Sequence, residues 1–245
     1  MKPVKILIFL VLALCTGLFS DAAFDEANKL YEAGKYFEAA AAYNNLLAAG
    51  NKSVEVYYNL GNACFKEKKT GLAILNYEKA LKLAPRDADI RYNLDFARSF
   101  IKETVVEDAV SKFLNSFFYY LTLNELFVIF SLALAVLMGI FIYRLFRKNE
   151  FSYWLTFGFS VFFAIVFVFS TLRILENENN RMAIVTASSV EAKSAPIETN
   201  PASFTIPEGK KVQILNTRKE WVEIFLKSEN MKGWIKQEAI AEIIP

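Results

Sequence analysis

Two uncharged apolar runs, Leu126–Tyr143 and Phe151–Leu172, constrain this chain more than any other feature of its sequence. At about 1.5 Å per residue, each run with a few flanking residues can cross a hydrocarbon layer about 30 Å thick. The link between them, residues 144–150, carries three basic side chains and one acidic side chain. Short loops rich in Lys and Arg stay in the cytoplasm. The pattern therefore predicts a membrane-spanning helical hairpin.

We expect transmembrane helices at residues 121–145 and 151–174, joined by a cytoplasmic loop at residues 146–150. Both outer ends of the hairpin then face away from the cytoplasm, so the soluble parts before and after it should lie on the extracytoplasmic side of the inner membrane. Charged side chains inside a membrane mark pumps and proton relays. The two runs contain none, so we do not expect a transporter or a channel.

The composition agrees with a membrane protein that carries soluble parts, because 54% of the residues are hydrophobic and only 22% are charged. A formal net charge of +2 argues against a nucleic-acid partner. The chain has no His, which excludes His-based catalysis and His-ligated metals. Its cysteines are Cys15 and Cys64, and only Cys64 lies outside the N-terminal targeting segment. We predict no catalytic, cofactor-binding or metal-binding residues and no enzyme activity.

Residues 1–22 are typical of a secretory signal peptide. Lys2 and Lys5 precede a short apolar core, and small residues follow at Ser20 and Ala22. We expect cleavage after Ala22. Lipid attachment at Cys15 and retention as an uncleaved anchor are the alternatives, and in each case the following residues emerge outside.

Residues 23–97 repeat themselves. The segment Gly34–Ala40 aligns with Lys68–Ile74 at an offset of 34 residues. The pattern Tyr57-Tyr-Asn-Leu-Gly-Asn-Ala-Cys-Phe65, continued by Ala73, Tyr77, Ala80 and Pro85, resembles a complete tetratricopeptide repeat. The copy before it is looser, and the segment that begins at Ala88 resembles a capping helix. The resemblance implies a short stack of helix pairs.

Such stacks present a concave face made by the first helix of each pair. The resemblance implies a groove lined by Asn28, Tyr31, Tyr58, Asn62, Phe65, Tyr92 and Phe96. In the functional interpretation, Asn side chains hold the backbone of a bound peptide or partner helix. In the alternative, the Asn residues are common consensus positions of the repeat and the aromatic side chains only pack.

Residues 98–120 place apolar side chains at helical spacing, with charged side chains on the other faces. This pattern indicates a juxtamembrane amphipathic helix lying on the outer leaflet. A continuation of the first span, or a part of the repeat core, is the alternative.

After a polar linker at residues 175–181, the chain changes to short alternating runs that predict strands about ten residues apart. Their order of landmarks resembles a bacterial SH3-type domain at residues 182–245, a small all-β barrel. The resemblance implies a binding surface around Trp221 and Trp234, with a packing role in the core as the alternative. We expect a variable loop at residues 190–201.

The fold class is therefore a multidomain membrane protein: α-helical tetratricopeptide repeats, two transmembrane helices and a small SH3-type barrel. This domain order resembles the BatE branch of the Bat (aerotolerance) family. The resemblance implies a non-catalytic scaffold in a cell-envelope stress complex, bound to the lipid bilayer and to protein partners. Those partners would include von Willebrand A-domain membrane proteins and a MoxR-type ATPase system. A module that binds peptidoglycan or its stem peptides is the competing hypothesis.

Overall fold

The computed structural model describes residues 22–101 and 118–244. The chain divides into two compact units, one made of Met1–Val105 with Met182–Pro245 and the other of Val106–Arg181. The predicted signal peptide at residues 1–22 lies almost wholly outside the described residues, as does most of the juxtamembrane segment predicted at residues 98–120. Arg98 and Ser99 of that segment belong to the last repeat helix.

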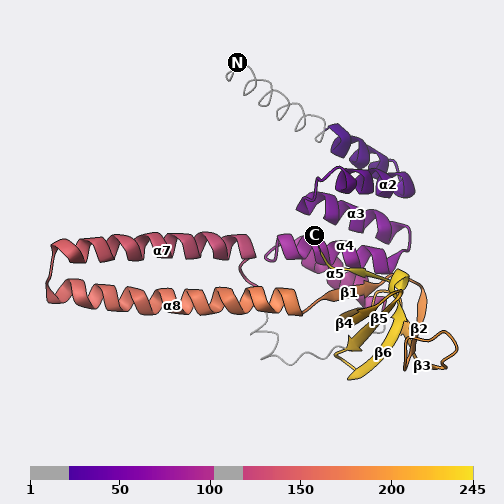
Figure 1. The fold of residues 1–245 in the computed structure, drawn as a ribbon. Helices are drawn as coiled ribbons and strands as arrows, with labels where there is room; N and C mark the ends of the chain where they lie inside the picture. Colours follow the sequence, from indigo (N-terminus) through magenta and orange to yellow (C-terminus); the bar gives the residue numbers. More distant parts are fainter. Residues whose placement is uncertain (1–21, 102–117, 245) are drawn as a thin grey trace, which may run out of the picture. The chain divides into compact units, whose positions relative to one another are not determined.

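The first unit begins with a stack of antiparallel helices (Figure 1). Residues 22–32 are helical. The helices that follow are α2 (Tyr36–Ala48), α3 (Val54–Lys66), α4 (Thr70–Leu83) and α5 (Ala88–Ser99). The sequence marks their starts: the Ser53 side chain accepts a hydrogen bond from the Val56 N–H at 3.3 Å, and Asp87 accepts one from the Ile90 N–H at 3.0 Å.

Small side chains bring these helices close together. Ala39, Ala73 and Ala80 are fully buried, and a Cβ added at Gly61 would lie only 2.7 Å from the Tyr77 ring. The tyrosine therefore fills the space that glycine leaves open, which is ridge-into-groove packing at short range.

The second unit is a helical hairpin of α7 (Leu123–Phe146) and α8 (Glu150–Asn179). Both helices start with a capping box, Thr122 with Glu125 and Asn149 with Ser152. Both are long and apolar enough to cross a membrane by length and composition. Helix α8 runs to Asn179, so most of the linker predicted at residues 175–181 is helical. No Gly or Pro interrupts this stretch, and Arg173 pairs with Glu176 one turn later.

The chain returns to the first unit as an antiparallel sheet of the order β3-β2-β6-β5-β4-β1-β7. The strands are β1 (Met182–Val185), β2 (Ser189–Lys193), β3 (Ala202–Pro207), β4 (Lys211–Arg218), β5 (Trp221–Leu226), β6 (Met231–Lys236) and β7 (Ile240–Glu242), with a 3₁₀ turn η1 (Gln237–Ala239).

The sheet contains strands that the sequence analysis did not predict. Residues 190–193, which we expected in a variable loop, form most of β2. Val190 and Ala192 alternate inward there while Glu191 is exposed. Gly233 permits a close approach of neighbouring strands, since an added Cβ would lie 2.9 Å from the Ala192 Cβ and 3.0 Å from Phe204.

Candidate functional site

A hydrogen-bonded centre lies between the first helices of the repeat stack. Asn28, on the helix at residues 22–32, is half-buried. Its Oδ1 accepts a hydrogen bond from the Tyr43 hydroxyl at 2.6 Å and one from Asn59 Nδ2 at 3.0 Å. Burial raises the pKa of Tyr43 to about 12, so the hydroxyl keeps its proton and remains the donor. The centre joins three successive helices.

The same centre recurs one repeat later. Asn62 Oδ1 accepts a hydrogen bond from the Tyr77 hydroxyl at 2.7 Å and one from Asn93 Nδ2 at 3.2 Å. Asn93 Nδ2 also donates to the Tyr58 hydroxyl at 2.8 Å. Burial raises the pKa of Tyr77 as well. The equivalent residues of the two centres, such as Asn28 and Asn62, are separated by the repeat length. The repeat in the sequence therefore produces the same hydrogen bonds twice.

These bonds limit which atoms of Asn28 and Asn62 are available for the peptide contact predicted from the sequence. In both residues the carboxamide oxygen is engaged inside the stack, so it is not the atom that would contact a peptide. The carboxamide nitrogen makes no hydrogen bond to another described residue. The carboxamide N–H groups of these two residues are therefore the donors available for the peptide contact that the sequence analysis predicts.

Aromatic side chains extend from this polar centre along the last helices. Phe65 lies 5.6 Å from both Phe96 and Phe100 between ring centroids, and Tyr92 stacks on Phe96 at 6.4 Å. Tyr92, Phe96 and Phe100 are 70%, 47% and 64% exposed. The structure thus joins Phe65 and Tyr92, predicted as groove residues, into one exposed aromatic face.

The sequence analysis did not assign Phe100 to this face, because it counted Phe100 in the juxtamembrane segment. The signal was present: Tyr92, Phe96 and Phe100 follow one another at intervals of one helical turn. Tyr31, at the other end of the predicted groove, packs edge-on against Tyr36 with 5.3 Å between centroids.

The two tryptophans predicted to form a surface on the sheet are covered by cations. Trp221 is 9% exposed and Trp234 is 8% exposed. Lys236 and Lys193 lie over the Trp221 ring at 4.6 and 5.7 Å from its centroid, and Arg218 lies over Trp234 at 5.5 Å. This arrangement favours the packing interpretation over an open ligand surface.

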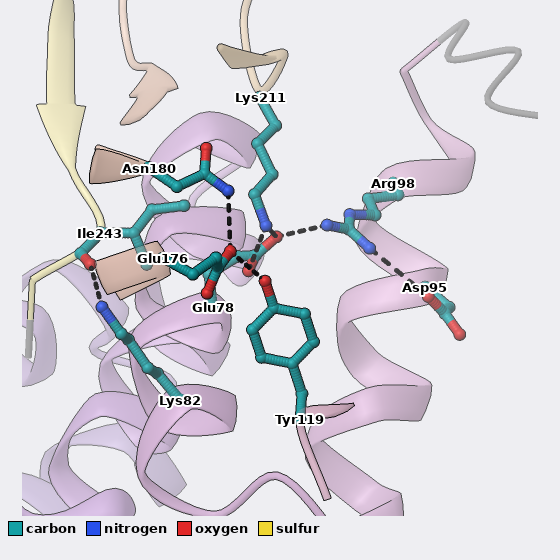
Figure 2. A network of polar contacts seen from close by, with 9 residues as sticks. All are labelled: Glu78, Lys82, Asp95, Arg98, Tyr119, Glu176, Asn180, Lys211 and Ile243. Carbon is teal, nitrogen blue, oxygen red and sulfur yellow. Dashed lines mark hydrogen bonds and ion pairs between the residues drawn. The ribbon is translucent and has the colours of Figure 1, made fainter. Parts of the chain in front are cut away.

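A cluster of charges joins the repeats to the sheet (Figure 2). Glu78 of α4 is buried. Both of its carboxylate oxygens lie 3.0 Å from Lys211 Nζ of β4, and Oε1 also accepts a hydrogen bond from Arg98 of α5. Burial by itself raises the pKa of this carboxyl, but the charges of Lys211 and Arg98 outweigh burial and hold the pKa below its usual value.

The sheet also binds the start of α4. Glu208 Oε1 accepts a hydrogen bond from the Gly71 N–H at 2.6 Å, where an acidic group is favoured by the unpaired N–H groups of the first turn. A Cβ at Gly71 would lie 2.7 Å from the Val185 carbonyl oxygen. The pair Glu208-Gly209 suits a turn before a strand, and nothing local in the sequence indicates a contact with a helix.

The two modules share an apolar core. Ile184 of β1 and Ile243 are buried in the cluster that contains the repeat helices, while Ala183 and Val185 are buried in the core of the sheet. Strand β1 is therefore covered on both faces, which is why its sequence is continuously apolar instead of alternating.

The hairpin unit has a polar network of its own, which Figure 2 also draws. The Tyr119 hydroxyl and Asn180 Nδ2 both donate to Glu176 Oε1, the latter at 2.9 Å. Arg173 stacks over the Phe118 and Tyr119 rings and donates to the Leu121 carbonyl at 3.3 Å. This network holds the chain before α7 against the last turns of α8.

A search of curated proteins found no match to this chain. A comparison with protein families identified one segment of it. Residues 54–87, which comprise α3, α4 and the turn that follows, match the tetratricopeptide repeat family. This segment includes Tyr58, Asn62 and Phe65 of the predicted groove and Glu78 of the charge cluster. The chain therefore contains a tetratricopeptide repeat, a module that serves protein–protein interaction, at residues 54–87.

Proposed function

We propose that this protein is a non-catalytic adaptor anchored in the inner membrane by α7 and α8, with the repeats and the sheet together on the extracytoplasmic side. The observation that carries the proposal is the shared core of the two soluble modules. The repeats precede the hairpin and the sheet follows it. A chain that spans the bilayer in between must return to the side it left for these modules to pack together.

The charge pattern supports the orientation. The turn between the two helices and the helix ends beside it, residues 144–150, contain Arg144, Arg147 and Lys148 with a single acid, Glu150. Under the positive-inside rule this turn stays in the cytoplasm, which places Glu78 and its partners outside.

The adaptor surface in this proposal is the groove of the repeat stack. It combines N–H donors of Asn28 and Asn62 with the exposed rings of Tyr92, Phe96 and Phe100. A peptide or helix with apolar side chains and accessible backbone carbonyls fits this combination, and aromatic side chains commonly anchor such interfaces. The setting we propose is a Bat-type envelope complex, with von Willebrand A-domain membrane proteins as partners and the sheet as an SH3-type domain.

Cysteine labelling tests the topology. In a background with Cys15 and Cys64 replaced by Ser, single cysteines are placed at Glu55 in the repeats, Lys232 in the sheet and Lys148 in the turn. A membrane-impermeant maleimide applied to intact spheroplasts should label the first two sites, and Lys148→Cys only after permeabilisation. Labelling of Lys148→Cys in intact spheroplasts, or protection of either of the other sites, would overturn the proposal.

Co-purification tests the adaptor role. After mild detergent extraction, the wild-type protein should recover A-domain membrane proteins, and Phe96→Ala should recover several-fold less. Phe37→Ala is the matched control, because Phe37 is a 66% exposed aromatic residue of α2 that is not part of the Phe65–Phe96–Phe100 face. Equal loss in both variants, or no recovery by the wild type, would refute the groove as the interaction surface.

The competing hypothesis, direct binding of cell wall through the sheet, requires Trp221 or Trp234 to contact the ligand. Both rings are almost completely buried beneath Lys and Arg side chains. A pull-down with purified peptidoglycan discriminates the hypotheses: retention that is lost in a folded Trp234→Ala variant would favour the wall-binding function over the adaptor.

A further inference from the structure

Helix α5 contacts the two helices that precede it in its own unit, α4 and α3. Its buried residues Ile90, Leu94 and Ala97 form a single face, and the helix packs against α4. Among the residues that the structure describes in this unit, no helix follows α5. In a repeat stack each helix is stabilised by its neighbours, and the last helix needs a cap.

The sheet reaches the C-terminal end of α5 through Glu78 of α4 and through Ile101, which follows the helix. Arg98 donates to the same Glu78 carboxylate that Lys211 of β4 binds. Ile101, directly after α5, packs on Gly209: a Cβ at Gly209 would lie 2.3 Å from Ile101 Cδ1 and 3.0 Å from Ile74 Cδ1. Gly209 also has a φ of +82°, which favours glycine.

Helix α5 is at the same time the last wall of the groove. It contributes Asn93 to the second hydrogen-bonded centre, and Tyr92 and Phe96 to the exposed aromatic face. Whatever fixes the end of α5 therefore fixes the geometry between these residues and Asn62 and Phe65 on α3.

From these contacts we infer that the C-terminal sheet is the cap of the repeat stack, and that Lys211 and Gly209 are positioning residues for the groove wall made by α5. Lys211 acts through the carboxylate that it shares with Arg98, and Gly209 acts through Ile101. The geometry of the groove then depends on the sheet, so the two are not independent binding modules. This inference deepens the proposed function, and its significance for partner binding rests on that function.

Hydrogen–deuterium exchange of the full-length protein in lipid nanodiscs tests the inference without any partner. In Lys211→Met, which keeps the length of the side chain but removes its charge, amides of α5 should exchange on the order of tenfold faster. Amides of α2 should be unchanged, because α2 packs against α3 away from the sheet. Lys211→Arg should restore slow exchange in α5. Lys232→Met is the matched control, since Lys232 lies on β6 and makes its ring contact with Phe225 of the sheet itself.

A pair of glycine variants tests the second contact. Gly209→Ala and Gly34→Ala both place alanine at a positive φ, +82° and +75°, but nothing lies within 4 Å of the Cβ position at Gly34. Faster exchange in α5 is expected only for Gly209→Ala. If Gly209→Ala does not fold, the Lys211 series decides alone.

Two results would overturn the inference: unchanged α5 exchange in a folded Lys211→Met protein, or an equal increase in α2, α5 and the sheet, which would show general destabilisation. Because the readout contains no partner, it separates this inference from the proposed function. Slow α5 exchange lost in Lys211→Met while co-purification fails would leave the cap in place and refute only the adaptor role.

Discussion

In the Glu78 cluster, removing both cations should lower the free energy of unfolding more than removing the carboxylate. The Glu78 side chain is 9% exposed, whereas those of Lys211 and Arg98 are each 31% exposed. If both cations are removed, as in Arg98→Met with Lys211→Met, a carboxylate is left buried without a partner, which costs about 3–5 kcal/mol. In Glu78→Met the two cations retain access to water, so the loss should be smaller, about 1–3 kcal/mol. Replacing all three by Met should return stability close to that of the wild type, since an apolar replacement of a buried ion cluster is often neutral.

Urea unfolding in detergent measures these differences. A Trp154→Phe background leaves Trp221 and Trp234 as the fluorescent reporters, so the signal follows the unit that contains the cluster. The prediction is an order of stabilities: wild type and triple variant highest, Glu78→Met intermediate, the double cation variant lowest. If Glu78→Met costs as much as the double variant, the reasoning from burial is wrong and the cluster behaves as a solvent-screened surface pair.

The contribution of Glu78 to the free energy of unfolding should change with pH in opposite directions in the wild type and in the double variant Arg98→Met with Lys211→Met. In the wild type the pKa of Glu78 is lowered, so its contribution to stability is complete above the unfolded value, 4.5, and is lost as the pH falls through the lower folded value. In the double variant, burial without cations raises the pKa. The stability gap between the two proteins should therefore narrow as the pH is lowered from about 7 towards about 5, the direction in which the stranded carboxyl takes up a proton. A gap that widens over this range would contradict the assignment.

Three further predictions follow from close contacts and burial. Gly61→Ala would place its Cβ 2.7 Å from the Tyr77 ring and should cost about 1–3 kcal/mol through overpacking. Hydrogen exchange in α4 measures this cost. The control is Gly158→Ala, a helical position where the added Cβ meets open space, and equal effects of the two variants would contradict the packing argument. Gly233→Ala would bring its Cβ to 2.9 Å from a neighbouring Cβ and should lower the melting temperature of the sheet, which tryptophan fluorescence follows. An unchanged melting temperature would mean that the strands can move apart without loss of stability. Burial raises the pKa of the Cys64 thiol to about 11, so native protein should react with a thiol reagent far more slowly than urea-denatured protein, and rapid modification of the native state would refute the burial of this side chain.

The repeat helices could be predicted because the same residue pattern recurs at a fixed interval in the sequence. The 34-residue offset that aligns Gly34–Ala40 with Lys68–Ile74 reappears as equivalent hydrogen bonds at Asn28 and Asn62. A pattern confined to one helix pair can be recognised in the sequence alone, since each pair contacts only its neighbours.

The contact between repeats and sheet could not be predicted in this way. Glu78 and Lys211 are 133 positions apart, and each occurs in a segment where a charged residue is ordinary. Glu78 is a solvated position of an amphipathic helix until the sheet covers it, and only the tertiary structure supplies the cover. The one local sign was the continuously apolar β1, with Ile184 and Val185 buried on opposite faces.

The end of α8 and the start of β2 were misjudged for a related reason. Polar residues after Leu172 favoured a linker, but Arg173 and Glu176 support another turn of helix through their own pair. In β2 the alternation lasts only from Ser189 to Lys193, which is short enough to resemble a loop.

Gly71 and Glu208, which are joined by a hydrogen bond, are 137 positions apart in the sequence. The two halves of this contact are therefore synthesised at different times. During translation the repeat helices leave the ribosome first, and the hairpin follows. The Glu208 carboxylate that completes the first turn of α4, and the lysine that neutralises Glu78, are made last. A nascent or truncated chain that ends before the sheet carries a repeat stack with an exposed apolar side and a Glu78 carboxylate that lacks Lys211 and has Arg98 as its partner. In the proposed topology, the repeats and the sheet can pack together only after the hairpin has returned the chain to the side of the membrane where the repeats lie. A wrongly inserted hairpin would then leave the repeats without the sheet.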